Sequence, residues 1–235
     1  MAKKLFFALF GLIYFSGFAF AGFGVNLRGG KLFGDSIFDK YDEHNYYIVD
    51  GGQDYKANFI NYGADIFFEK RISNEIFGLD GYGYLGAKVG YTIYEESYYR
   101  LHTQLLGGNK FNFTSTAYAV PIMIYYNYED EDNEHWRFGG GLGIVFLHSE
   151  YTYKSSGFVF QDFDEKDSRL SVMPRLELGV EYTLVKRMSL FLNLGYQFNG
   201  KIETDFKPLD EKLWIDYSGI TIDIGIKFNL IRNNE

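Results

Sequence analysis

Within a predicted strand over residues 217–230, residues 220–230 alternate strictly between apolar and polar side chains. A period of two is that of a β-strand with one apolar and one polar face. An apolar face of this kind can pack against a protein core or contact a lipid bilayer, so this segment alone does not distinguish a soluble protein from a membrane barrel. The apolar positions are Ile220, Ile222, Ile224, Ile226, Phe228 and Leu230, and the other face carries Thr221, Asp223, Gly225, Lys227 and Asn229.

Seven more segments show the same alternation: residues 23–33, 58–69, 82–94, 114–126, 136–148, 170–184 and 188–198. In residues 114–126 the consecutive Val120, Pro121, Ile122 and Met123 leave the facing open, and the proline removes one ladder donor. The four long connections are residues 34–57, 95–113, 149–168 and 199–216, and short ones lie between them. An even strand number with this asymmetry predicts an all-β, eight-stranded antiparallel up-and-down transmembrane β-barrel.

The first 21 residues have the pattern of a secretion signal. Lys3 and Lys4 precede an apolar run that ends in Ala19-Phe20-Ala21, small residues at the two positions that a signal peptidase reads. A retained transmembrane helix is the alternative, but the run is shorter than the roughly 20 residues that a span needs. We therefore expect residues 1–21 to be a signal peptide and residues 22–235 to form the barrel.

The composition narrows the chemistry. The 21 Tyr and 24 Phe against 3 Pro favour strands and interfacial aromatic belts. The chain has no cysteine, which excludes disulfides and thiolate chemistry, and no cofactor is expected. A formal net charge of −8 argues against nucleic acid as a partner.

Ten charged residues fall on the predicted polar faces, five basic and five acidic. A soluble lipocalin is the alternative eight-stranded fold, but it would bury these ten charges in an apolar calyx, and the free-energy cost of that burial excludes it. Inside a membrane barrel they can pair, and an eight-stranded barrel leaves a lumen that side chains just fill. We therefore predict a lumenal charge network of Arg28, Asp65, Glu69, Lys88, Arg137, Arg175, Glu177, Glu181, Asp223 and Lys227; a narrow ion path is the alternative.

The last predicted strand carries Asp223-x-Gly225-x-x-Phe228-x-Leu230, which resembles the signal read by the barrel assembly machinery. Over nearly all of residues 22–235 the chain resembles the small eight-stranded outer-membrane barrels of the OmpA/OmpX-like porin superfamily. The resemblance implies the outer membrane of a Gram-negative cell, assembly by that machinery, and contact with membrane lipid and lipopolysaccharide. Family members often end on an aromatic residue, whereas this chain continues through residues 231–235.

Two polar clusters invite other interpretations. His148-Ser149-Glu150 invites comparison with the Ser-His-Glu site of the lipid A deacylases. Neighbouring strand residues point to opposite faces, so His148 is poorly placed as a base for Ser149, and we predict no enzyme. The acidic run of residues 129–134 lacks the glycine and spacing of an EF-hand and indicates a solvated turn rather than a calcium loop.

The long connections combine acidic residues with many tyrosines, a composition suited to rigid aromatic contacts with a ligand. Anchoring at the membrane interface is the alternative role. The sequence favours a non-enzymatic surface scaffold whose loops bind a host or cell-surface ligand, with a small porin-like channel as the alternative. The tyrosines are Tyr41, Tyr46, Tyr47, Tyr55, Tyr98, Tyr99, Tyr151 and Tyr153.

Overall fold

The computed structural model describes residues 22–36, 47–49, 56–73, 81–103, 110–156, 163–206 and 211–232. Eight long strands form the barrel: β1 (Gly22–Ser36), β3 (Lys56–Ser73), β4 (Tyr82–Thr103), β5 (Lys110–Glu129), β6 (Trp136–Ser156), β7 (Phe163–Val185), β8 (Met188–Gln197) and β11 (Gly219–Arg232). The short strands in these ranges are β2 (Tyr47–Val49), β9 (Lys201–Phe206) and β10 (Glu211–Asp216). The predicted eight-stranded all-β fold is confirmed. The predicted signal peptide lies outside the described residues.

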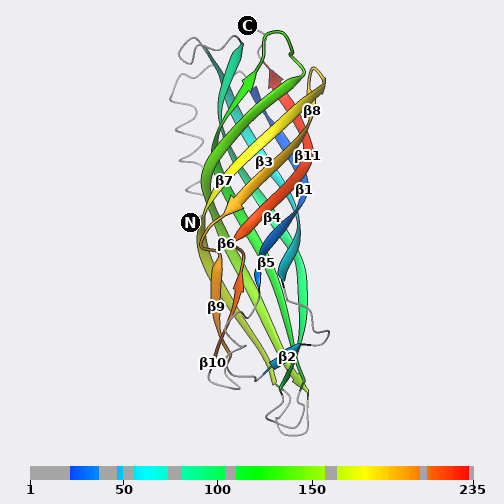
Figure 1. Ribbon diagram of the computed structural model, residues 1–235, viewed down its shortest axis with the longest axis vertical. Coiled ribbons are helices and arrows are strands. Elements are labelled where there is room, and N and C mark those ends of the chain that lie inside the picture. Colours follow the sequence, from blue (N-terminus) through cyan, green and yellow to red (C-terminus); the bar gives the residue numbers. More distant parts are fainter. Residues whose placement is uncertain are drawn as a thin grey trace.

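The sheet closes into a barrel because β1 pairs with β11 and β4 pairs with β5 (Figure 1). The strands follow the order β4-β3-β1-β11-β8-β7-β6-β5, and β4 pairs again with β5. The first and last barrel strands join in an antiparallel ladder that sets Leu27 opposite Ile226. Closure leaves no unpaired edge around the body of the barrel, which is what a bilayer requires of a sheet.

Large apolar side chains cover the outside of the barrel. Along β8, Leu190, Leu192 and Leu194 are exposed, whereas Phe191 and, farther along the strand, Gln197 point inward and are buried. The same alternation leaves Leu178 67% and Ile224 64% exposed. An apolar surface of this extent fits lipid rather than water. No helix in the described ranges is long and apolar enough to cross a membrane.

Aromatic pairs flank the apolar surface at both ends. At the end with the β5–β6 and β7–β8 turns, which we name the turn end, the Trp136 ring centroid lies 4.7 Å from that of Tyr182. Toward the opposite end Tyr196 and Phe198 lie 4.6 Å apart. Such belts mark the two interfaces of a bilayer.

Four strands continue past the others at the opposite end, which we name the long-strand end (Figure 1). Strands β4 to β7 include residues 95–103, 110–113, 149–156 and 163–168, which pair in antiparallel ladders with one register shift, between Tyr94 and Ser97 of β4. The sequence assigned these residues to loops, and that assignment was wrong. The predicted fourth loop is also partly ordered, because β9 and β10 pair as a hairpin, and β2 pairs with the end of β4.

The open question about residues 114–126 is settled by burial. Pro121 and Met123 point into the barrel, and Val120 and Ile124 point outward. The β4–β5 ladder pairs Val89 with Ile122 and Thr92 with Ala119 but contains no pair at Pro121. The missing amide donor of proline thus interrupts the ladder without shifting its register.

Candidate functional site

Glycines on the inner wall make room for large side chains on the neighbouring strand. Gly30 faces Asp223 across the β1–β11 ladder, and a Cβ on Gly30 would lie 2.2 Å from Asp223 Oδ1. Gly86 faces Tyr125 in the same way, with the ring 2.4 Å from such a Cβ. The larger member of each pair therefore extends across the lumen over its glycine partner.

A balanced set of charges occupies the middle of the lumen, and we name it the central cluster. Arg28 Nε lies 3.2 Å from Asp65 Oδ2. Arg175 Nη2 lies 2.6 Å from Asp223 Oδ2 and 3.1 Å from Glu177 Oε2. Lys88 pairs with Glu177 from the opposite side of the barrel. The cluster consists of Arg28, Asp65, Lys88, Arg175, Glu177 and Asp223, three cations and three carboxylates.

A second set of charges lies near the turn end and is named the turn-side cluster. Lys227 Nζ donates to Glu69 Oε2 at 2.9 Å and to Glu181 Oε2 at 3.0 Å. Arg137 donates to Glu129 Oε2 at 2.5 Å and to Glu69 Oε1 at 3.3 Å. All five side chains are buried. Rings also cover both cations, with Lys227 Nζ 4.6 Å from the Phe67 centroid and the Arg137 guanidinium 4.0 Å from that of Tyr84.

An aromatic cap closes the lumen toward the long-strand end. The Tyr217 ring stacks on Phe59 at 4.6 Å and lies 5.7 Å from Tyr94. Its hydroxyl lies 2.9 Å from Ser115 Oγ and 3.3 Å from Ser149 Oγ. Tyr217 and Ser149 are fully buried. We define the cap as Phe59, Tyr94, Ser115, Ser149 and Tyr217.

The β9–β10 hairpin is attached to the barrel at the cap. Tyr217 directly follows β10, and its amide donates to Gly200 O at 3.0 Å. Gly200 N in turn donates to Ser218 Oγ at 2.6 Å, and Gln197 Nε2 donates to Tyr217 O at 3.1 Å. The chain then enters β11 through Gly219 at φ 136°, a conformation that favours glycine. These contacts fix the hairpin to the barrel wall.

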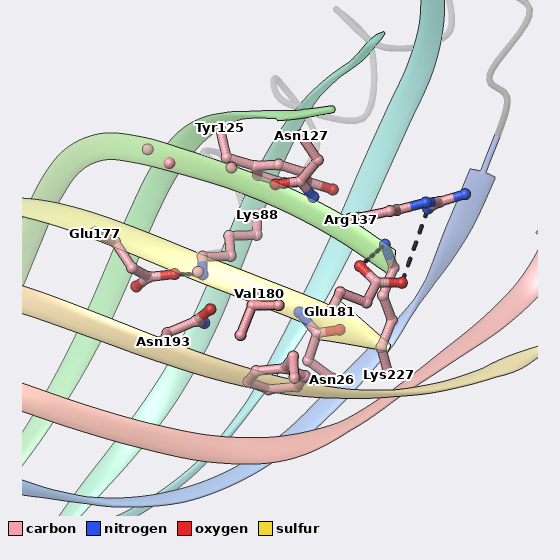
Figure 2. A pocket seen from close by; sticks show the side chains of 15 residues that line it. Asn26, Lys88, Tyr125, Asn127, Arg137, Glu177, Val180, Glu181, Asn193 and Lys227 are labelled. Carbon is pink, nitrogen blue, oxygen red and sulfur yellow. Dashed lines mark hydrogen bonds and ion pairs between the residues drawn. The ribbon is translucent and has the colours of Figure 1, made fainter. Parts of the chain in front are cut away.

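A small chamber lies between the two charge clusters (Figure 2). Its volume is about 60 Å³, and its lining includes Asn26, Lys88, Glu177, Glu181 and Lys227. A water needs about 10–15 Å³ of such space, so the chamber has room for several waters. Charged pairs and the cap separate it from the long-strand end.

The structure places all ten residues of the predicted charge network inside the barrel, divided between the two clusters. It adds Glu129, which the sequence assigned to a solvated turn; for Glu129 that interpretation was wrong, although Asp130 to Glu134 are exposed. Thr92, which accepts from Arg28 Nη2, and Tyr125, which donates to Glu69, were also missed. Tyr151, expected at the surface, is fully buried.

Two other sets of candidate residues have clear positions. Asp223 and Gly225 of the proposed assembly signal point inward, whereas Leu230 lies on the outer face and is 54% exposed. His148 and Ser149 point to opposite faces of β6, and His148 Nε2 lies 3.4 Å from Glu150 Oε1. The described part of the chain contains no group of three or more His, Cys, Asp or Glu that would hold a metal ion.

Comparison with known proteins shows likeness of fold alone. No protein-family model matches the chain, and no curated protein sequence is significantly similar. Among solved structures, Neisserial surface protein A aligns with a TM-score of 0.45 and 13% identity over 91% of this chain and 100% of its own. OprG of Pseudomonas aeruginosa gives 0.48 and 15% over 89% and 96%. The protease OmpT of Escherichia coli gives 0.43 and 7% over 92% and 99%.

The barrel's own geometry gives its class. A closed eight-stranded antiparallel sheet with an apolar exterior, aromatic belts and a charged interior is the architecture of an outer-membrane β-barrel. The chain is therefore an integral eight-stranded barrel of the outer-membrane class.

Proposed function

We propose that this barrel is a non-enzymatic surface scaffold whose lumen is a sealed structural core and whose long-strand end presents loops to a ligand on a host or neighbouring cell. The observation that carries the proposal is the filling of the lumen. Two clusters of paired charges and the aromatic cap occupy it, and the chamber between the two clusters has a volume of about 60 Å³. A core of this kind supports a wall but gives solutes no path.

The energetic cost of opening the lumen supports the same proposal. A solute that crossed the lumen would have to separate Arg175 from Asp223, or Lys227 from Glu69, both of which are buried pairs. Breaking one buried pair typically costs about 3–5 kcal/mol, because a charge is left without its partner. Several such pairs would have to open in series.

The long-strand end offers the surface for a ligand. Because β4 to β7 continue as paired strands past the cap, their ends on this side lie beyond the apolar band. In the proposed orientation this end lies outside the cell, and the β5–β6 and β7–β8 turns face the periplasm. The connecting loops lie outside the described residues, so the ligand is defined only by the acidic, tyrosine-rich composition of those segments.

Assembly and lipid contacts complete the proposal. The barrel assembly machinery would read the motif Asp223, Gly225, Phe228 and Leu230 on β11, the strand that closes the sheet onto β1. Membrane lipid, including lipopolysaccharide in the outer leaflet, would cover the apolar exterior.

Single-channel recording of the purified barrel in planar bilayers tests the sealed lumen. We expect no reproducible conductance steps at neutral pH from the wild-type protein. As a positive control, the double variant Tyr125→Gly and Arg137→Gly should widen the turn half and increase the noise or conductance. Steps from the wild-type protein that vanish in Arg175→Ala or Glu177→Ala would overturn the sealed lumen and establish the alternative function, a small ion channel.

Protease treatment of intact cells tests the surface topology. A protease added outside should cut loops at the long-strand end and leave the membrane-embedded barrel intact. The β5–β6 turn at residues 130–135 should be cut only after the outer membrane is opened. Cutting in the reverse order would overturn the proposed orientation.

A further inference from the structure

Lys31 is a basic residue on the lipid-facing side of the barrel. Its neighbours in the two ladders of β1 are Ile60 and Ile222, each 41% exposed on the outer face. Its ammonium lies 4.9 Å from the centroid of the Phe33 ring, and no carboxylate in the described part of the chain pairs with it. A cation in apolar surroundings calls for an anionic partner, which here has to come from outside the chain.

The ammonium of Lys31 points toward the aromatic belt nearest the long-strand end. Phe33, over which the ammonium lies, pairs with Ile220, and Ile220 pairs with Tyr196 of that belt. Lysines near a membrane interface extend their charged ends to the level of the lipid headgroups. Lysine is a common phosphate-binding residue, so this ammonium is placed to meet a headgroup phosphate.

An apolar furrow crosses the outer wall from Leu85 on β4 to Ile220 on β11, and we name it the outer furrow. On one side Leu142 pairs with Leu176, and Leu176 pairs with Tyr196. On the other side the position on β6 is Gly140, which carries no side chain. The furrow is open to the lipid and has a volume of about 740 Å³. Ligand sites usually measure about 300–1,000 Å³, so the outer furrow has room for an acyl chain.

The side of the outer furrow that contains Gly140 leads to Lys31. Gly140 of β6 pairs with Leu178 of β7, and Leu178 pairs with Leu194 of β8. Leu194 pairs with Ile222 of β11, and Ile222 pairs with Lys31. The basic residue thus lies on the strand next to the β11 end of the furrow.

Rows of paired residues climb toward the long-strand end in the same direction. A row that starts at Asn127 of β5 passes through β6, β7, β8, β11, β1, β3 and β4, and it returns to β5 at Ala117. Ala117 is nearer the long-strand end than Asn127 is. The end of the outer furrow beside Lys31 is therefore the end nearer the long-strand end of the barrel.

We propose that Lys31 and the outer furrow together bind one molecule of lipid A, the phosphorylated glycolipid of lipopolysaccharide. A phosphate lies on the Lys31 ammonium, and one acyl chain lies along the furrow. The choice of an outer-leaflet lipid rests on the proposed function, which places the long-strand end outside the cell. Charge complementarity selects the headgroup, and the apolar furrow holds the chain.

Native mass spectrometry of the purified barrel in detergent micelles measures this binding, with bis-phosphorylated lipid A as the probe. We expect one retained copy on the wild-type barrel and a Kd about fivefold higher for Lys31→Gln. Lys31→Arg should bind like wild type. So should Lys70→Gln, the matched control, because Lys70 pairs with the lipid-facing Leu85 toward the turn end.

Removal of the phosphates gives the same test from the side of the lipid. Dephosphorylated lipid A should bind the wild-type barrel as weakly as intact lipid A binds Lys31→Gln, and the substitution should then have no further effect. Equal affinity of wild type and Lys31→Gln for intact lipid A would overturn the site. So would equal affinity of the wild type for the two lipids.

Nuclear Overhauser contacts between acyl protons and methyl groups test the outer furrow. In deuterated detergent, contacts from lipid A should be strong at Leu176 and Leu194, which line the furrow, and weak at Leu27, which lies outside it. All three leucines are 51% exposed, so exposure alone predicts equal contacts. An even distribution would mean ordinary surrounding lipid and would overturn the furrow as a binding site.

Failure of the lipid site and failure of the surface scaffold give different results. The binding tests are made in micelles and do not depend on the orientation of the barrel. Binding without dependence on Lys31, with loops still cut from outside intact cells, would refute the site and leave the scaffold. Binding that depends on Lys31, with those loops cut only from the periplasm, would refute the scaffold and the outer-leaflet source of the lipid.

Discussion

Arg137 donates a hydrogen bond from Nε to Glu129 Oε2 over 2.5 Å, across the ladder position where β5 and β6 meet the turn that joins them. The turn between them is exposed and acidic, yet this pair is buried inside the barrel. The pair thus closes the turn end of the lumen from within, and Arg137 continues from there to Glu69 on the opposite side of the lumen.

The first prediction concerns this arginine. Arg137→Met should destabilise the folded barrel by about 3–5 kcal/mol, because three buried carboxylates then share a single lysine. Urea unfolding in detergent micelles, followed by tryptophan fluorescence, measures the change. Arg187→Met on the exposed β7–β8 turn is the control and should fall within about 0.5 kcal/mol of wild type. Equal stability of the two variants would show that the turn-side cluster is not an energetic unit.

Two adjacent glycines on β1, Gly29 and Gly30, test which face of the strand points into the lumen. A Cβ on Gly30 would lie 2.2 Å from Asp223 Oδ1, whereas a Cβ on Gly29 would meet nothing closer than 3.7 Å. Gly30→Ala should therefore cost about 1–3 kcal/mol through overpacking, and Gly29→Ala should be nearly neutral. Heat-modifiable migration and urea unfolding of both variants supply the comparison. The reverse order of stabilities would place β1 in the opposite facing.

Tyr217 should control both the stability of the cap and the order of the β9–β10 hairpin. Tyr217→Ala removes a fully buried ring and should cost about 3–5 kcal/mol, with faster trypsin cleavage at Lys201 and Lys212. Tyr217→Phe keeps the stacking and should cost less, about 1–3 kcal/mol, because Ser115 and Ser149 lose a partner. The control Tyr62→Ala changes a lipid-facing tyrosine that is 58% exposed. Unchanged cleavage in Tyr217→Ala would show that other contacts hold the hairpin.

Phe228 tests the proposed assembly signal. Phe228→Asp places a charge near the bilayer interface, where the equilibrium cost is only about 1 kcal/mol or less, so loss of recognition should dominate. We expect little heat-modifiable barrel in the outer membrane and unfolded protein in the periplasm, measured by fractionation and immunoblot. Phe228→Leu should assemble. Deletion of residues 233–235 leaves β11 complete and should also be tolerated. Normal assembly of Phe228→Asp combined with failure of the deletion would mean that the signal lies elsewhere.

The alternation of side chains predicted the strands where lipid covers one face. Residues 136–148 and 188–198 show a clear period of two because Leu142, Ile144, Leu192 and Leu194 face lipid and their neighbours face the lumen. Past this apolar band the sequences of β4 to β7 show no regular apolar period, because tyrosine, serine and charged residues follow one another there, while the backbone ladder continues. For that reason residues 95–103 and 149–156 resembled loops although they are strands.

The same period of two predicted which charged residues point into the lumen. It could not predict which of them pair with each other, because that depends on how the barrel closes. Inward-facing Arg28 and Asp223 are 195 residues apart, and only closure of β1 on β11 brings them together. Glu129 was missed because four acidic residues in the adjacent turn hid its position on the inner face of β5. Tyr217 was missed because it precedes β11 and is no part of its apolar period, and its place in the cap depends on the turn through Gly219.

The pairing of glycines with large neighbours makes this barrel a starting point for an engineered pore. Gly24, Gly86 and Gly225 already have no side chain, so the space above each is held by one neighbour, Phe67, Tyr125 or Phe191. Shortening those three rings would hollow the lumen from the turn end without altering any strand register. The diameter of such a pore would then be set by how many rings are removed, one residue at a time, within an unchanged wall.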